Sequence, residues 1–328
     1  MKRRDFIALL GGATAWPLAA RAEPERMRRI GVLMVWPESD PEAQAQIAAF
    51  RDGLRSLGWA EGRNIKLDVR WSSAEVAVIH RFAKDLTDLQ PDVFLATGTP
   101  AVNAILRETR TVPIVFTQVT DPVAQGLVKS LERPGGSMTG ITIFEPEIGG
   151  KWLQVLKEMA TGVGRAAVIF NPDTAPYYRL YMRSVEAAAA TLGTKVFEAP
   201  VRNRADIEGA LRDLARQPDS GVIVMSDLFA MVHRDLIVAL TARYRVPAVY
   251  PIRSFVMEGG LISYGVDLTK MQRRAAIFVD RILQGAKPAD LPVELPTHFE
   301  LIINQPTART LGLDIPLTLL TRADEVID

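Results

Sequence analysis

Cysteine is absent from the 328 residues of this chain, and histidine occurs only three times. The lack of cysteine excludes thiol catalysis, thiolate metal sites and lipid attachment at an N-terminal cysteine. The histidines, His80, His233 and His298, do not have the spacing of metal ligands. We therefore expect neither a metal nor a cofactor.

Motifs for nucleotide binding and for nucleophilic catalysis are also missing. The sequence GVGRAA at 162–167 has the glycine spacing of a dinucleotide site, but it precedes a strand-like segment when it should follow one. No Gly-Lys-Ser/Thr phosphate loop and no Gly-x-Ser-x-Gly elbow occur. The sequence therefore favours a protein that is not an enzyme.

A strong net charge is lacking as well. The whole chain carries a formal charge of +1, and residues 1–22 alone carry +3, from one lysine and three arginines against one aspartate. The remainder is thus −2. A nearly neutral chain has no basic surface for nucleic acid, so we expect no such partner.

The longest apolar run lies at the N-terminus and is typical of an export signal. Basic residues precede an apolar stretch from Phe6 to Ala20, and a small-x-small site predicts cleavage after Ala22. The pair Arg3-Arg4 indicates twin-arginine export, with an ordinary Sec signal as the alternative. No later run is long enough to span a bilayer, so we expect a periplasmic mature chain without a membrane span.

Strand-like and helix-like segments alternate along the rest of the chain. Short apolar runs predict strands at 29–36, 65–71, 93–96, 113–116, 140–144, 166–170, 195–199, 221–225, 247–250, 260–265 and 299–304. Helical periodicity predicts helices at 40–58, 76–86, from 100, from 122, and at 147–160, 176–192, 207–214, 228–243 and 268–284, with a short one from 306. Asp40 is expected to cap the first, with Pro41 at its first position.

This alternation predicts an α/β fold of two Rossmann-like lobes, each a parallel sheet flanked by helices. About 300 residues suit two lobes better than one. Open sheets of this kind bind ligands beyond the carboxyl ends of their strands, where the strand order reverses. The strand-to-helix junctions are therefore the candidate site.

The junction TGTP at 97–100 offers a site for a small anion. Thr99 can cap the following helix, and Pro100 suits its first position. The amides of Ala101 and Val102 would then be free at the positive end of the helix dipole, a site for a carboxylate. The alternative is an ordinary cap without a ligand. The candidate ligand residues here are Thr97, Gly98, Thr99 and Ala101.

Other strand ends add polar and aromatic candidates, although caps and core packing could also explain them. These candidates are Trp36, Gln118, Asp121, Asn171, Tyr177, Asp227, Tyr250 and Tyr264. Together they suggest a zwitterion-sized ligand whose carboxylate lies on the 97–101 turn. Asp227 or Asp121 would be the partner of its amino group.

The segments VTDPVAQGLV, FNPDTAPYY, SYGVD and INQPTARTLGLDIP, with the export signal, resemble one family in their order and spacing. It is the ABC-transporter substrate-binding proteins of the tryptophan/tyrosine-binding type, which have the type I periplasmic binding protein architecture. The resemblance covers essentially the whole mature chain, although each motif alone is loose.

The resemblance implies a solute receptor with a hinge and an interlobe cleft. It places the first lobe at 23–143 and 266–296 and the second at 144–265 and 297–328, with crossings near 141–147, 262–267 and 292–300. It implies a small carboxylate-bearing ligand, an amino acid or an aromatic acid. The partners would be the permease subunits of an importer with a separate ATPase, and the receptor would be a monomer. A periplasmic sensing subunit, or less readily an α/β enzyme, remains an alternative.

Overall fold

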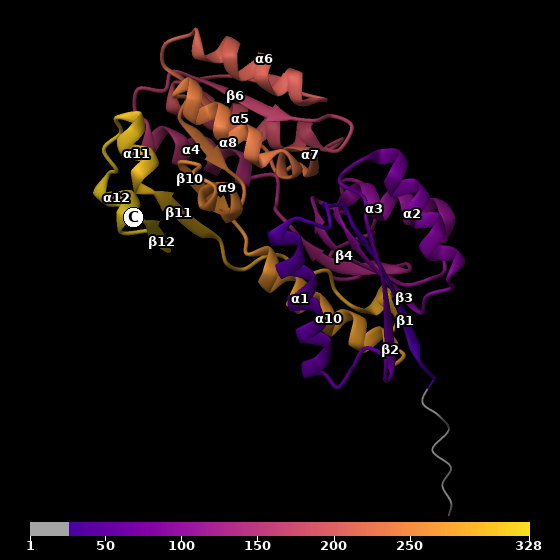
Figure 1. The fold of residues 1–328 in the computed structure, drawn as a ribbon. Coiled ribbons are helices and arrows are strands. Elements are labelled where there is room, and N and C mark those ends of the chain that lie inside the picture. The colour runs from indigo at the N-terminus through magenta and orange to yellow at the C-terminus, as the bar shows by residue number, and fades with distance from the viewer. Residues whose placement is uncertain (1–25) are drawn as a thin grey trace, which may run out of the picture.

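The computed structural model describes residues 26–328, so the predicted export signal lies outside the described residues. Two sheets organise the chain (Figure 1). The first has the strand order β2-β1-β3-β4-β5 and is parallel throughout. Its strands are β1 (Arg28–Met34), β2 (Ile65–Trp71), β3 (Val93–Thr97), β4 (Ile114–Val119) and β5 (Met138–Thr142).

The second sheet has the order β12-β11-β10-β9-β8-β6-β7, and only the β10–β11 pair is antiparallel. Its strands are β6 (Arg165–Phe170), β7 (Lys195–Pro200), β8 (Ser220–Val224), β9 (Ala248–Tyr250), β10 (Ile262–Gly265), β11 (Glu300–Asn304) and β12 (Glu325–Ile327). The inner strands β3, β4 and β8 are buried along their whole length, as expected for a parallel sheet covered on both faces.

Helices cover both faces of the first sheet. α1 (Pro41–Ser56) packs along α10 (Leu268–Leu283), which also contacts β3, β4 and β5, whereas α2 (Val76–Asp88) packs with α3 (Gly98–Glu108). α10 is separated from α1 by more than 200 residues of sequence, yet the two helices lie side by side in the lower body of Figure 1. Asp40 caps α1 through the amide of Ala43, as the sequence predicts.

Helices of the second sheet form the upper body of Figure 1. α4 packs on α5, and α6 packs on α8. Apart from α10, the helices after α3 are α4 (Ile148–Met159), α5 (Tyr178–Leu192), α6 (Arg204–Ala215), α7 (Leu228–Val232), α8 (Arg234–Tyr244), α9 (Arg253–Met257), α11 (Gln305–Leu311) and α12 (Leu317–Leu320), with a 3-10 turn, η1 (Pro288–Asp290).

Three stretches of chain connect the two bodies: β5 to α4, β10 to α10, and η1 to β11. Backbone hydrogen bonds join the end of β5 to the third connection, from the Thr142 amide to the Glu294 carbonyl (3.0 Å) and from the Glu294 amide to the Gly140 carbonyl (2.9 Å). The third connection is thus paired with the strand from which the first connection leaves.

Two predicted helices differ in the structure. The helix expected from Pro122 is wrong: residues 122–126 form consecutive turns, and Gly126 has a φ of 69°, outside the right-handed helical region, so no helix continues through it. The single helix expected at 228–243 is divided into α7 and α8 at His233, whose φ of −104° and ψ of 23° interrupt it.

Candidate functional site

The order of strands reverses between β1 and β3 in the first sheet, so their carboxyl ends border a crevice. Trp36 follows β1, and Thr97 ends β3; both are fully buried. The Thr97 hydroxyl accepts a hydrogen bond from the Val35 amide (3.2 Å) and donates one to the Leu33 carbonyl (3.1 Å). Through these hydrogen bonds, Thr97 links the end of β3 to the end of β1 at the switch point.

Helix α3 begins at Gly98, two residues before the predicted start, with Thr97 and not Thr99 at the N-cap. Since a helical amide bonds to the carbonyl four residues earlier, Ala101 and Val102 donate within the helix. The expectation of free amides at those two residues is therefore wrong. The amides without an acceptor inside the helix are those of Gly98 and Thr99, and Gly98 has a φ of 80°.

Gln118 lies in a distortion of β4. The register with β5 shifts between Phe116 and Val119, and Gln118 has a φ of 58°, a conformation uncommon outside glycine. β-Bulges re-aim side chains and are frequent next to binding sites. The Gln118 Nε2 atom donates to Oε1 of Gln46 on α1 (2.8 Å), and the other amide atom of each residue is buried without a partner among the described residues.

The second sheet reverses its order between β6 and β8, and Asn171 and Asp227 stand just beyond those strands. The Asn171 amide donates to Asp227 Oδ2 (2.7 Å), the Thr174 hydroxyl donates to Oδ1, and the Phe229 amide also donates to Oδ1 (3.1 Å). Asp227 therefore caps α7. Its side chain also links the ends of β6 and β8, as the Thr97 side chain links the ends of β1 and β3.

Burial raises the pKa of the Asp227 carboxyl from 3.8 to about 6, although hydrogen bonds from Thr174, Asn171, Phe229 and Ala230 oppose the rise. Because the folded state then binds more protons than the unfolded state, stability from this group is present below about pH 4 and falls as pH rises to about 6. Relative to Asp227→Asn, the wild type should lose about 2 to 3 kcal/mol of unfolding free energy across that window. Urea unfolding of both proteins from pH 4 to 7 measures this, and a pH-independent difference would contradict it.

Two buried tyrosines, Tyr177 and Tyr181, lie near this junction in the second lobe. The Tyr177 hydroxyl donates to the Ser226 carbonyl (3.2 Å), and the rings of Tyr177 and Tyr181 have centroids 6.0 Å apart. Burial raises the pKa of both phenols above their ordinary range, so both remain protonated at neutral pH. They are hydrogen-bonding groups and not charges.

The two switch points face one another. A Cβ atom at Gly98 would lie 2.8 Å from Cδ1 of Leu228, the residue after Asp227. Nearby, the Thr120 hydroxyl of the first lobe is 2.9 Å from the Tyr181 hydroxyl of the second. The predicted carboxylate site at 97–99 is thus closed over by the start of α7.

An ion pair also joins the lobes. Arg234 on α8 bonds through NH1 to Oδ2 of Asp40, the cap of α1, and through Nε to Glu258 of its own lobe (2.6 Å). The side chains of Arg234 and Asp40 are 9% and 7% exposed. The Arg234 guanidinium also lies 5.9 Å from the centre of the Trp36 ring. We call the Asp40–Arg234 pair the interlobe pair.

Three predicted site residues have other neighbours. Asp121 caps the turn after β4 by accepting from the Ala124 amide (2.9 Å). The Tyr250 hydroxyl bonds with Thr241 (2.8 Å) and its ring stacks on Phe255. The Tyr264 ring stacks on Phe299, 5.7 Å away, beside the connections between lobes. Trp36, residues 97–101, Gln118, Asn171, Tyr177 and Asp227 thus lie at or beside the two switch points. Tyr250 and Tyr264 have separate packing partners, whereas Asp121 follows Thr120, whose hydroxyl meets Tyr181.

Sequence reasoning missed several residues of the interlobe face. These are Glu42, Gln46, Tyr181, Leu228 and Arg234. The sequence predicts Asp40 as the cap of α1, but it does not predict that the second carboxylate oxygen of Asp40 binds Arg234. Nothing in a helical pattern distinguishes Arg234 from a solvated arginine, so only the packing of the lobes identifies it.

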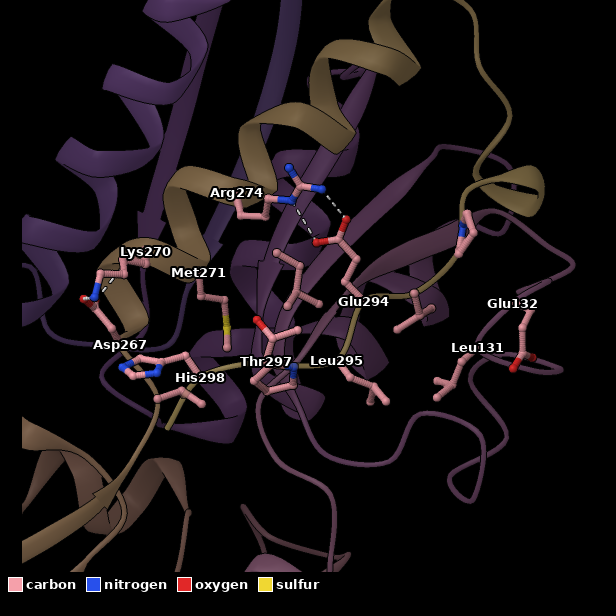
Figure 2. Close-up of a pocket in the computed structure, with 15 residues that line it drawn as sticks. Leu131, Glu132, Asp267, Lys270, Met271, Arg274, Glu294, Leu295, Thr297 and His298 are labelled. Carbon is pink, nitrogen blue, oxygen red and sulfur yellow. Dashed lines mark hydrogen bonds and ion pairs between the residues drawn. The ribbon is translucent and has the colours of Figure 1, made fainter. Parts of the chain in front are cut away.

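A cavity of about 710 Å³ lies beside the connections between the lobes, not at the switch points (Figure 2). Figure 2 shows Arg274 of α10 reaching Glu294 through two contacts, of 2.9 and 2.7 Å. Val266 and the 292–298 segment line the cavity together with Ile141 of β5, so two of the three connections contribute to it. Its shape should therefore change with any rotation of the lobes.

The described part of the chain contains no cluster of three or more potential metal ligands. Across residues 26–328, no helix is both long and apolar enough to cross a bilayer.

Comparison with known proteins places this architecture among solute receptors. A family model described as "ABC transporter substrate binding protein" matches residues 30–327. A protein named "Tyrosine-binding protein" from Clostridioides difficile (strain R20291) is 25% identical over 295 residues, which are 89% of this chain and 83% of the relative.

Solved structures agree in fold. A conserved domain protein from Vibrio cholerae is 29% identical, with a TM-score of 0.85 over 92% of this chain and 100% of that chain. An ABC domain in complex with L-Trp from Streptococcus pneumonia is 24% identical, with a TM-score of 0.84 and the same coverage. A ligand-free, open substrate binding protein from Clostridium difficile is 23% identical, with a TM-score of 0.67 over 92% of this chain and 99% of that chain.

The two-sheet α/β architecture predicted from the sequence is confirmed by these structures, and the family resemblance by the family model. The matched family consists of binding proteins and not of catalysts. The chain belongs to the ABC transporter substrate-binding protein family.

Proposed function

We propose that this chain is the extracytoplasmic receptor of an ABC importer and that it captures an amino acid between its two lobes. The observation that carries the proposal is the opposition of the two switch points, with Gly98 against Leu228. Ligands of open α/β sheets bind at such points. The similarity to proteins named for tyrosine binding and solved with L-Trp favours an aromatic amino acid as the first candidate.

The ligand carboxylate would lie on the amides of Gly98 and Thr99. These amides have no acceptor inside α3, and the positive end of the helix dipole lies behind them. The carboxylate thus keeps the position expected from the sequence, although its amide donors are two residues earlier.

The three connections would act as the hinge, with lobe boundaries as expected from the sequence. Segments that link two packed bodies absorb the dihedral changes of closure. The chain superposes more closely on the neighbour solved with L-Trp than on the open, ligand-free neighbour, at similar identity. This supports a closed arrangement of the lobes here. A ligand that contacts both lobes stabilises that arrangement, which the permease would recognise.

Mass spectrometry of the small molecules that co-purify with the protein tests this function, followed by calorimetry of stripped protein. We expect one amino acid, aromatic in the first instance, to bind with a stoichiometry of one. Binding of sugars but not of amino acids, or chemical turnover of the ligand, would overturn the proposal.

A further inference from the structure

A carboxylate that sequence analysis did not consider lies at the interlobe face of the first lobe. Glu42 is in the first turn of α1, two residues after the Asp40 cap, and it is partly buried. Within residues 26–328 it forms no ion pair, whereas its neighbours Asp40 and Asp267 bond to Arg234 and Lys270 respectively. Among the described residues, Glu42 is thus an acidic group without an ion-pair partner, and the charges of Asp40 and Asp267 act on it.

The surroundings of Glu42 make an uncompensated charge there costly. Burial raises the pKa of the Glu42 carboxyl above its ordinary value, and the charges of Asp267 and Asp40 raise it further. Arg234 and the Gln46 amide lower it, but less. An added cation would relieve both the burial and the repulsion between like charges.

Hydrogen-bonding groups without partners accompany this carboxylate. Gln46 lies one helical turn beyond Glu42 and is fully buried, and its Nε2 atom has no partner at hydrogen-bonding distance within residues 26–328. The Gln118 Oε1 atom is equally unpartnered, in a residue that is 4% exposed. Whichever way the two bonded amides are turned, one NH₂ group and one carbonyl oxygen remain unused. Trp36 adds a fully buried indole N–H that has no acceptor in the part of the chain that the structure describes.

These groups lie around the switch point of the first sheet. Thr97 pairs with Thr117, so Gly98 and Gln118 follow adjacent positions of neighbouring strands. The Thr97 hydroxyl bonds the residue before Trp36. Donors for a carboxylate and acceptors for an ammonium therefore occur at one edge of one sheet.

We propose that Glu42, with the free carbonyl of the Gln46–Gln118 amide pair, binds the α-ammonium group of the ligand. This assignment rests on the proposed function, because it specifies the α-amino acid class of the ligand for that same site. The ammonium group donates to the Glu42 carboxylate and to the amide carbonyl. The carboxylate of the same ligand accepts from the Gly98 and Thr99 amides and from the Trp36 indole.

Asp227 and Asp121 are weaker candidates for this role. The Asp227 carboxylate is 1% exposed and already accepts from Asn171, Thr174 and Phe229. Asp121 already caps its turn. Glu42 has no comparable set of backbone and hydroxyl donors among the described residues, so its carboxylate oxygens are open to a ligand.

The test compares amino acids with analogues that lack only the amino group. L-Tryptophan and L-tyrosine are titrated by calorimetry beside indole-3-propanoic acid and 3-(4-hydroxyphenyl)propanoic acid. The proteins are stripped wild type, Glu42→Gln and the control Glu38→Gln. Glu38 is an exposed glutamate four residues before Glu42. Thermal melting of each protein verifies folding.

We expect Glu42→Gln to weaken binding of the amino acids at least about 10-fold and to leave the des-amino acids within about twofold of wild type. Glu38→Gln should behave as wild type. An equal loss for both ligand types, or no loss for either, would overturn the assignment to Glu42 while the receptor function stands. If wild type binds neither amino acid, the tryptophan/tyrosine ligand class fails and the assignment fails with it.

Discussion

Arg234→Met should weaken ligand binding by about 100-fold, because the closed protein would then bury Asp40 without its partner. Both members of the interlobe pair are almost inaccessible to water. Breaking such a buried pair typically costs about 3 to 5 kcal/mol, whereas in an open form Asp40 would be solvated. The cost therefore falls mainly on the closed, ligand-bound state. Methionine retains most of the apolar stem beside Trp36, so packing changes little.

Calorimetric titration of the ligand into Arg234→Met measures this loss. Glu258→Gln is the matched control, since Glu258 binds the same arginine from within the second lobe and is 34% exposed. It should lose far less affinity than Arg234→Met. Affinity within threefold of wild type in Arg234→Met would show that the interlobe pair does not hold the closed state.

Gly98→Ala should lower ligand affinity about 10-fold through a contact made only when the lobes are closed. The new Cβ atom would lie 2.8 Å from Leu228 Cδ1, so the second lobe would have to shift. Alanine at a φ of 80° also costs about 1 kcal/mol, but that strain is present whether the lobes are open or closed. The backbone strain should thus lower the melting temperature, whereas the contact with Leu228 should lower the ligand affinity.

A Leu228→Ala background distinguishes the effect of the contact with Leu228 from the effect of the backbone strain at residue 98. Removing the Leu228 side chain removes the contact but not the backbone strain, so Gly98→Ala should then have almost no effect on affinity and the same effect on stability. Calorimetry and melting temperatures of the four proteins provide the comparison. An affinity loss that persists in the Leu228→Ala background would mean that closure does not bring these residues together.

The sequence predicts the strand ends at which the site forms, because buried parallel strands are short apolar runs with clear boundaries. Trp36, Thr97, Asn171 and Asp227 all follow from that pattern. The cap at Asp40 was predictable from local chemistry alone. Local patterns were misleading at Pro122, where a proline after an aspartate begins a turn as readily as a helix.

The tertiary partners could not be predicted in the same way. Asp227 and Thr97 carry the polar groups of a binding site, but the structure uses them to join strand ends. Glu42 and Arg234 resemble exposed helical residues in sequence, and only the approach of α10 and of the second lobe buries them. Residues whose role depends on lobe contacts therefore require the structure.

Small-angle X-ray scattering of the stripped protein, with and without a saturating amino acid ligand, tests most directly whether the two lobes close over that ligand. We predict that the ligand reduces the radius of gyration and that scattering with ligand matches the arrangement in Figure 1. An unchanged radius of gyration at full saturation would contradict closure of the lobes.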